Sequence, residues 1–313
     1  MGRRTLLLFA AVLAAASPAP AQTPSAAPVF AGVWTHPVFP WFEPPASGPG
    51  PITNLSRWPE SAQQPNPAQG SAALPPTTVG VSDYDQLVGD YKSPILQPWA
   101  AAAVKKFGEM SLAGITYPNP SNQCWPAPVP FIFKLFNVQF LQQADKVTIL
   151  YANPDHEIRR VRMNQRHPAR VKPSWYGDSV GRYEGDTLVI DTVGVKTDRP
   201  FAMVDLFGTP FTGRLHIVER YRLRDYDEVK DALQRSAKEN WQFNGDVWSK
   251  HRGKFLQLHV TIEDEGVFTT PWTATLTYVP SADPFPESVC AENPYEYYNN
   301  KEADVPKAKK ADF

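Results

Sequence analysis

The sequence predicts a mainly β protein: an antiparallel meander that forms a barrel or a strongly twisted sheet, with a proline-rich N-terminal arm and one or two helices. Two observations favour this fold class. From residue 131 onward, the chain contains short runs rich in β-branched and aromatic residues, and turn residues separate several of them. Of the 33 prolines, 13 lie between Gln22 and Gly80. Regular short strands joined by tight turns are typical of meanders and barrels.

Residues 1–21 have the features of a cleaved signal peptide. Arg3 and Arg4 form a charged start, an apolar stretch runs from Leu6 to Ala16, and residues 19–21 read Ala-Pro-Ala, as at a cleavage site. The apolar stretch is shorter than the roughly 20 residues that span a bilayer. We therefore expect a periplasmic or secreted protein without a membrane span, exported by the general route or, through its arginine pair, by the twin-arginine route.

Residues 22–92 are predicted to form an extended arm. Proline lacks an amide donor and restrains the residue before it, so pairs such as Pro44-Pro45 and Pro75-Pro76 exclude helix and central strand. The arm also carries large apolar side chains that a solvated linker would not need. We expect it to wrap around the domain and bury these rings: Trp34, Phe39, Trp41, Phe42 and Trp58.

Residues 93–300 are expected to form one β domain. Ser93-Pro94 resembles a helix start and predicts a helix near 95–110, which Pro98 can delay. A polar, partly helical insertion is expected over 225–253, and residues 301–313 form a charged tail. The predicted strands are Val138–Gln142, Lys146–Tyr151, Glu157–Met163, Ser179–Arg182, Thr187–Val193, Leu215–Leu223, Leu256–Ile262 and Thr273–Val279.

The charge balance argues against nucleic acid and anionic membranes as partners. Removing Arg3 and Arg4 with the signal peptide takes two of the 31 basic residues, which leaves 29 against 32 acidic residues, a net charge of −3. Such a balance provides no basic footprint for a polyanion. The expected partner is a small-molecule ligand or substrate, and the oligomeric state stays open.

Two cysteines, Cys124 and Cys290, are far apart in a chain expected to enter an oxidising compartment. We predict a disulfide between them, which would tie the core to the C-terminal segment. A catalytic thiol at Cys124 is the alternative, although Cys124-Trp125-Pro126 supplies no neighbouring base.

The segment GRYEGDTLVIDT, residues 181–192, raises the question of catalysis because it groups three acids around a glycine. Its pattern predicts a hairpin, with Gly185 in the turn and Thr187–Val193 as a strand. Glu184 and Asp186 then fall at the turn, where acids are ordinarily solvated. The structural interpretation is favoured over a catalytic pair.

Strand alternation gives a better candidate. In Leu215–Leu223, Glu219 lies on the same face as Leu215, Ile217, Tyr221 and Leu223. A carboxylate on an inner face must be paired, hydrogen-bonded or protonated. Glu219 is therefore either a general acid or base, or half of a structural ion pair with an arginine such as Arg159 or Arg160; the ion pair is favoured.

Among the six histidines, His167 is the strongest candidate for acid–base chemistry, because it follows a strand in a loop where sites are commonly built. His216 and His259 lie on predicted strands, where a packed or solvent-facing role is expected, and Asp191 is a weaker candidate on a strand with mixed faces. No two histidines have metal-ligand spacing. We expect no metal and no organic cofactor.

These segments resemble a broad group of exported, mostly uncharacterised bacterial proteins with a G-[HD]-S-x-G-x-[WY]-E-G-D-T-L-V-x-D-T motif. The resemblance covers about Cys124 to Asn293 and implies kinship, but no activity to carry over. It rests on Cys124-Trp125-Pro126, Gln165-Arg166-His167-Pro168, Gly177 to Thr192, Pro210-Phe211-Thr212, Glu219-Arg220, Thr261-Ile262-Glu263-Asp264, Pro271-Trp272-Thr273 and Glu287 to Asn293.

The chain departs from this pattern at three positions. Asp178 and Phe211 stand where the group has histidines, and Tyr183 stands where it has tryptophan. If those histidines form a metal or acid–base cluster in relatives, this chain keeps only His167. Either Asp178 replaces an imidazole as a base, or the protein has become a binder.

Two functions follow. The first is a periplasmic enzyme, independent of cofactors, that performs elimination, isomerisation or hydrolysis on a small apolar or aromatic molecule. Its predicted catalytic residues are His167, Asp178 and Glu219, and its substrate-binding residues are Tyr176, Tyr183 and Arg220. The second is a non-catalytic periplasmic binding protein that uses the same pocket. A small β-barrel can serve either function, so the fold alone does not decide between them.

Overall fold

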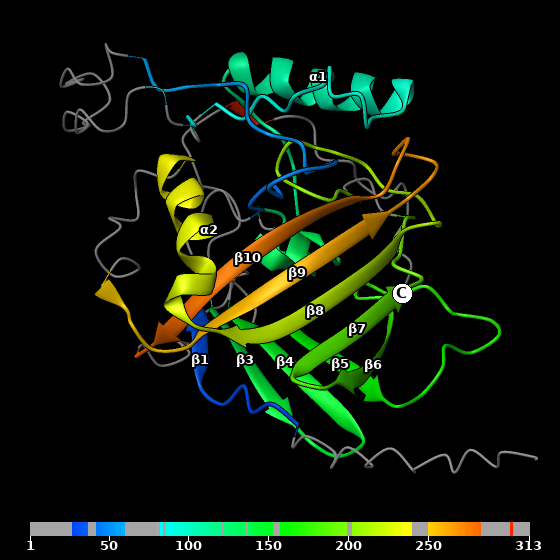
Figure 1. Ribbon diagram of the computed structural model, residues 1–313. Helices are drawn as coiled ribbons and strands as arrows, with labels where there is room; N and C mark the ends of the chain where they lie inside the picture. Colours follow the sequence, from blue (N-terminus) through cyan, green and yellow to red (C-terminus); the bar gives the residue numbers. More distant parts are fainter. Residues whose placement is uncertain are drawn as a thin grey trace, which may run out of the picture.

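The fold is known from a computed structural model of the chain (Figure 1). It describes residues 27–36, 42–59, 80, 82–83, 86–120, 122–134, 137–152, 157–198, 202–239, 250–282 and the backbone of 301–302. The predicted signal peptide, Phe39 and Trp41 of the arm, Cys290, and nearly all of the charged tail lie outside the described residues. Among the residues described, no helix has both the length and the apolar character needed to cross a membrane.

Nine strands form a closed barrel in the order β1-β10-β9-β8-β7-β6-β5-β4-β3, with β1 also paired to β3 (Figure 1). The mainly β prediction is confirmed, and all eight predicted strands are present within two residues of their expected ends. The strands are β1 Val33–Thr35, β3 Asn137–Gln142, β4 Lys146–Ala152, β5 Glu157–Met163, β6 Asp178–Glu184, β7 Thr187–Val193, β8 His216–Arg224, β9 Phe255–Glu263 and β10 Trp272–Ser281.

The barrel is mixed rather than purely antiparallel, because β5 and β6 run parallel. Their ladder pairs only Arg162 with Val180 and Met163 with Gly181. A parallel connection must return the chain to the same end of the sheet, and it needs a dozen or more residues to do so. Residues 164–177 make this crossing, and they bring His167 onto the outside of the wall. The expected simple meander is therefore wrong at this one connection.

Strand β1 comes from the predicted arm and closes the barrel. Val33 pairs with Ser281 of β10 on one side and with Gln139 of β3 on the other. Among the described residues of this range, Phe30, Trp34 and Phe42 are buried in the core, and Trp58 is partly buried. Residues 33–35 thus supply a wall strand, which the prediction of an extended arm did not include.

The hairpin predicted over 181–192 is present. Gly185 and Asp186 form a two-residue turn between β6 and β7, and Gly185 has a φ of 60°. A positive φ at the first turn position is the geometry of a type II′ turn, which favours glycine there. The acids of the turn are ion-paired rather than only solvated: Glu184 binds Arg220, and Asp186 accepts from Arg222 at 2.6 Å.

Two α-helices accompany the barrel (Figure 1). Helix α1, Pro98–Leu112, has proline at its first position and starts later than expected, because Pro98 is tolerated there but not in a helix interior. Its Gln97 amide donates to Val267, which joins the helix start to the loop before β10. Helix α2, Tyr226–Glu239, lies within the predicted insertion and packs Val229 against Phe255 and Val279. Strands β2, Ile115–Thr116, and β11, Lys301–Glu302, form a separate parallel pair.

Candidate functional site

The candidate residues lie on two different faces of the barrel wall, the inner and the outer. Along β8, Ile217, Glu219 and Tyr221 are buried inside, whereas His216 and Arg220 alternate with them on the outer face. The same alternation separates Ser179, inside, from Asp178, outside, on β6. The predicted inward direction of Glu219 is confirmed. It also means that Glu219 lies across the wall from Asp178.

Inside the barrel, Glu219 forms a two-pronged ion pair with Arg159 of β5. Arg159 Nη1 lies 2.8 Å from Glu219 Oε2, and Nη2 lies 2.5 Å from Oε1. The guanidinium also donates to Ser179 Oγ at 3.0 Å and to Thr192 Oγ1 at 2.6 Å, and Tyr221 donates to Glu219 at 3.0 Å. Arg159 is 1% exposed and Glu219 0%, so neither charge is available to a ligand from solvent. This is the arginine pair that the sequence named as the structural alternative.

The surrounding tyrosines belong to the same buried array. Burial raises the pKa of Tyr151 to about 12 and that of Tyr221 and Tyr278 well above the ordinary value. These phenols are therefore neutral at physiological pH. The hydrogen bonds of the Arg159–Glu219 ion pair join β5, β6, β7 and β8, whereas the buried Tyr151 hydroxyl has no hydrogen-bond partner among the residues that the structure describes.

On the outer face, His167 links two carboxylates. Its Nδ1 lies 2.6 Å from Asp178 Oδ1 and its Nε2 lies 2.9 Å from Asp191 Oδ1. Arg162 donates to both oxygens of Asp178, at 2.7 and 2.9 Å. The structure thus brings together His167 and Asp178, as the sequence predicted, and adds Asp191 on the neighbouring strand as the third member.

The chain of contacts continues to a second histidine. His216 Nε2 lies 3.1 Å from Asp191 Oδ1, and its Nδ1 lies 3.2 Å from Glu263 Oε2. Asp178, His167, Asp191, His216 and Glu263 therefore form one row of alternating acids and imidazoles, here named the relay. It crosses the outer face from β6 to β9.

The relay has a defined charge pattern. The hydrogen bond to Asp191, followed by the one to Glu263, raises the pKa of His216 to about 9, although burial opposes the shift. The hydrogen bond from His216 lowers the pKa of Asp191. At neutral pH, His216 is thus an imidazolium between two carboxylates. An ionised Asp191 can only accept hydrogen bonds, so Nε2 of His167 and Nε2 of His216 must each carry a proton.

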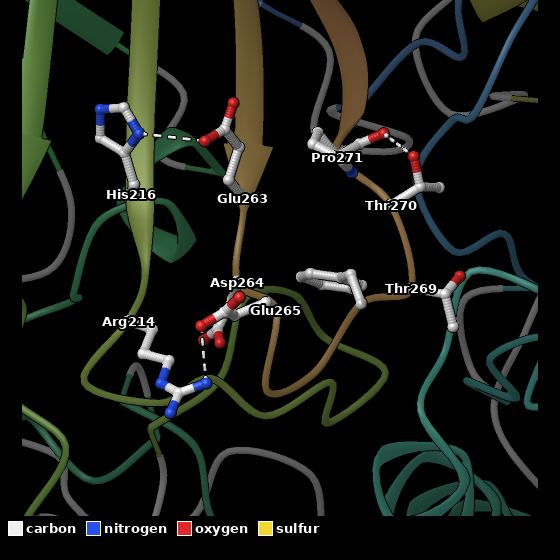
Figure 2. Close-up of a pocket in the computed structure, with 9 residues that line it drawn as sticks. Arg214, His216, Glu263, Asp264, Glu265, Thr269, Thr270 and Pro271 are labelled. Carbon is white, nitrogen blue, oxygen red and sulfur yellow. Dashed lines mark hydrogen bonds and ion pairs between the residues drawn. The ribbon is translucent and has the colours of Figure 1, made fainter.

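The His216 end of the relay opens into a pocket of about 290 Å³ (Figure 2). Figure 2 shows His216 and Glu263 on one side, Arg214 and Glu265 on another, and Thr270 and Pro271 facing them. Asp264 is nearly fully buried and accepts from Thr212 and Gly266, so it holds the pocket loop rather than a ligand. The remaining lining residues are Phe268 and Thr269.

Three other predicted site residues lie away from this pocket. Tyr183 is on the inner face, roughly 16 Å along β6 from Asp178 at about 3.3 Å per residue, and its hydroxyl accepts from Gln142 at 2.7 Å. Arg220 is on the outer face but pairs with Glu184 at the hairpin end. Tyr176 is partly buried and packs against the core. Tyr183 and Arg220 are therefore not gathered around His167, and none of the three side chains lines the pocket.

Sequence reasoning missed His216 and Glu263. The available signal was alternation: His216 and Glu263 each occupy an outward position at the end of a strand beside inward apolar neighbours. Their pairing across β8 and β9 depends on the register, in which His216 faces Glu263 directly. Phe211, at a position where the resembled group has histidine, is buried in the core and does not take part.

Two further predictions concern covalent and metal chemistry. The Cys124–Cys290 disulfide remains a prediction, because Cys290 lies outside the described residues. Over the described part of the chain, no group of three His, Cys, Asp or Glu side chains has an arrangement that could hold a metal ion. No family model, curated protein or solved structure matches this chain.

Proposed function

We propose that this protein is an exported, cofactor-independent enzyme that transfers protons to or from a small molecule with an apolar or aromatic body. The observation that supports this proposal is the relay, whose last two residues, His216 and Glu263, line the pocket. The reaction class is elimination, isomerisation or hydrolysis, since each needs an acid and a base but no redox group.

His216 acts as the general acid in this proposal. Its imidazolium carries a proton on Nδ1 at the pocket, while Nε2 is held by Asp191. A carboxylate behind an imidazolium fixes its orientation and stabilises its charge, as in hydrolytic triads. His167 and Asp178 in turn hold Asp191, so their role is positioning. Glu263 is 46% exposed and is the carboxylate in contact with His216, so it is the base in this proposal.

One observation favours the alternative, a non-catalytic binding protein. All four ring nitrogens of His167 and His216 already lie within 3.2 Å of a carboxylate oxygen. A rigid, fully engaged array of charges suits ligand recognition without turnover. Catalysis requires the substrate to displace Glu263 from His216, which a binder does not need.

The test is mass spectrometry of small molecules after incubation of the purified protein with a metabolite extract, with free and retained compounds recorded separately. The enzyme proposal expects one mass to fall while another rises, and His216→Gln to abolish this change. His259→Gln is the matched control, because His259 is also an outward histidine on the barrel but pairs across β8 with Arg220 instead of Glu263. A compound retained unchanged would establish the binding protein instead.

Export to the periplasm and the Cys124–Cys290 disulfide belong to the same proposal. The supporting features are the signal-like residues 1–21 and the presence of only two cysteines. The intact mass of protein from a periplasmic extract should show the loss of residues 1–21. Digestion of the same protein without reductant should give a pair of peptides joined through Cys124 and Cys290. A full-length chain with two alkylated thiols would contradict both.

A further inference from the structure

The walls of the pocket carry two ion pairs, one partly buried and one exposed. His216 pairs with Glu263, and Arg214 Nη1 pairs with Glu265 Oε1 at 2.6 Å (Figure 2). Each pair presents one cation and one anion to the same cavity. Asp264, the remaining charge, is already committed to Thr212 and Gly266.

These pairs can exchange partners at small cost. The side chains of Arg214 and Glu265 are 67% and 78% exposed, and exposed ion pairs contribute little to stability because water screens them. Glu263 is 46% exposed and, within the described residues, receives a hydrogen bond only from His216. A ligand can therefore recruit Arg214 and Glu263 without dismantling the barrel.

We infer that the pocket binds a small zwitterion, namely an α-amino acid with an apolar side chain, and this inference rests on the pocket proposed above as the functional site. Arg214 would hold the carboxylate, since a guanidinium presents parallel donors that match two carboxylate oxygens. Glu263 would hold the ammonium group. Pro271 supplies apolar surface for the side chain, and the edge of the nearly buried Phe268 adds to it.

The charge pattern disfavours ligands with a single charge. A carboxylate without an ammonium would face Glu263 and Glu265, and an ammonium without a carboxylate would face Arg214 and His216. Like charges brought together in a binding site reduce affinity strongly. The cavity of about 290 Å³ is at the lower limit of ligand pockets, which span roughly 300–1,000 Å³, and this size also favours a single amino acid.

Binding of the ammonium to Glu263 also has a consequence for His216. The 3.2 Å contact from His216 Nδ1 to Glu263 would be replaced, whereas the contact to Asp191 would remain. The freed Nδ1 proton would then point toward the ligand. The same event that selects a zwitterion would prepare the imidazolium for proton transfer.

Calorimetric titration of the purified protein with three matched compounds tests this inference: L-phenylalanine, 3-phenylpropionate, which lacks the ammonium, and phenethylamine, which lacks the carboxylate. A second series uses L-leucine, 4-methylpentanoate and isopentylamine. We expect the amino acid of at least one series to bind about tenfold or more tightly than either partner compound, since each loses a charged hydrogen bond and gains a repulsion.

Variants assign the two ends of the ligand. Arg214→Gln should weaken binding of the amino acid about tenfold and strengthen binding of the amine, whereas Glu263→Gln should weaken binding of the amino acid and strengthen binding of the carboxylate, because each change removes a like charge that repels the singly charged compound. Arg222→Gln and Asp186→Asn are the matched controls, because they break an exposed ion pair at the hairpin end. Circular dichroism checks that each variant is folded.

The outcomes separate this inference from the enzyme proposal. Equal binding of the zwitterion and a singly charged compound, or no binding in either series, overturns the inference. Zwitterion binding without turnover supports it and contradicts the enzyme. Turnover of a compound that lacks one of the two charges supports the enzyme proposal and overturns the inference of a zwitterionic ligand.

Discussion

Replacing Arg159 with methionine should destabilise the barrel strongly while leaving the outer pocket in place. The guanidinium contacts Glu219, Ser179 and Thr192, and within the described residues it is the one cationic group paired with Glu219. Methionine fills much of the volume but leaves the Glu219 carboxylate buried without its counter-charge. Removing one partner of a buried ion pair costs about 3–5 kcal/mol.

The assay is urea unfolding monitored by tryptophan fluorescence, with thermal unfolding alongside. At about 2–4 °C per kcal/mol for a domain of this size class, a loss of about 4 kcal/mol corresponds to a melting temperature lower by roughly 8–16 °C. The slope of the urea transition should stay unchanged, because the surface exposed on unfolding is the same.

The double variant Arg159→Met, Glu219→Leu tests the cause. Once both charges are gone, the desolvated carboxylate no longer opposes folding, so the double variant should regain at least half of the loss. A residual deficit is expected, because Tyr221 loses its acceptor while Ser179 and Thr192 still bond each other at 2.9 Å. A single variant that loses less than about 1 kcal/mol, or a double variant less stable than Arg159→Met, would refute the reasoning.

Three further predictions concern protonation and packing. The pKa of His216 is raised to about 9 in the folded state, so the stabilisation from its charged form should be complete below about pH 6.5 and lost as the pH rises through 9. Solvent exposure limits this contribution to about 1 kcal/mol. His216→Gln should remove this part of the pH dependence of the melting temperature. Burial raises the pKa of Asp205 to about 6, so its protonation should add stability as the pH falls from 6 toward 4, and Asp205→Asn should abolish that gain in urea unfolding. Gly181→Ala should cost about 1–3 kcal/mol, because the added Cβ would meet Val161 Cγ1 at 2.8 Å; an unchanged urea midpoint would show that the wall gives way there.

Much of the barrel could be predicted because its signals are local. The ranges of β5 and β7 were predicted to the residue, since alternation and turn residues act within a few positions of one another. The inward direction of Glu219 followed from the alternation of side chains along β8. The hairpin followed from the turn residues Gly185 and Asp186. His167 was chosen for the same kind of reason, its place in a loop directly after a strand.

What the sequence by itself determined was therefore eight of the nine barrel strands, the turn at Gly185 and the inward face of Glu219 on β8. Only the tertiary structure decided which strands are neighbours: the parallel crossing from β5 to β6, the closure of the wall by β1, and the alignment of His216 with Glu263. The physical reason is that alternation fixes a side chain's face within its own strand, whereas order and register depend on packing among segments distant in the chain. The relay and its pocket exist only after that packing is complete.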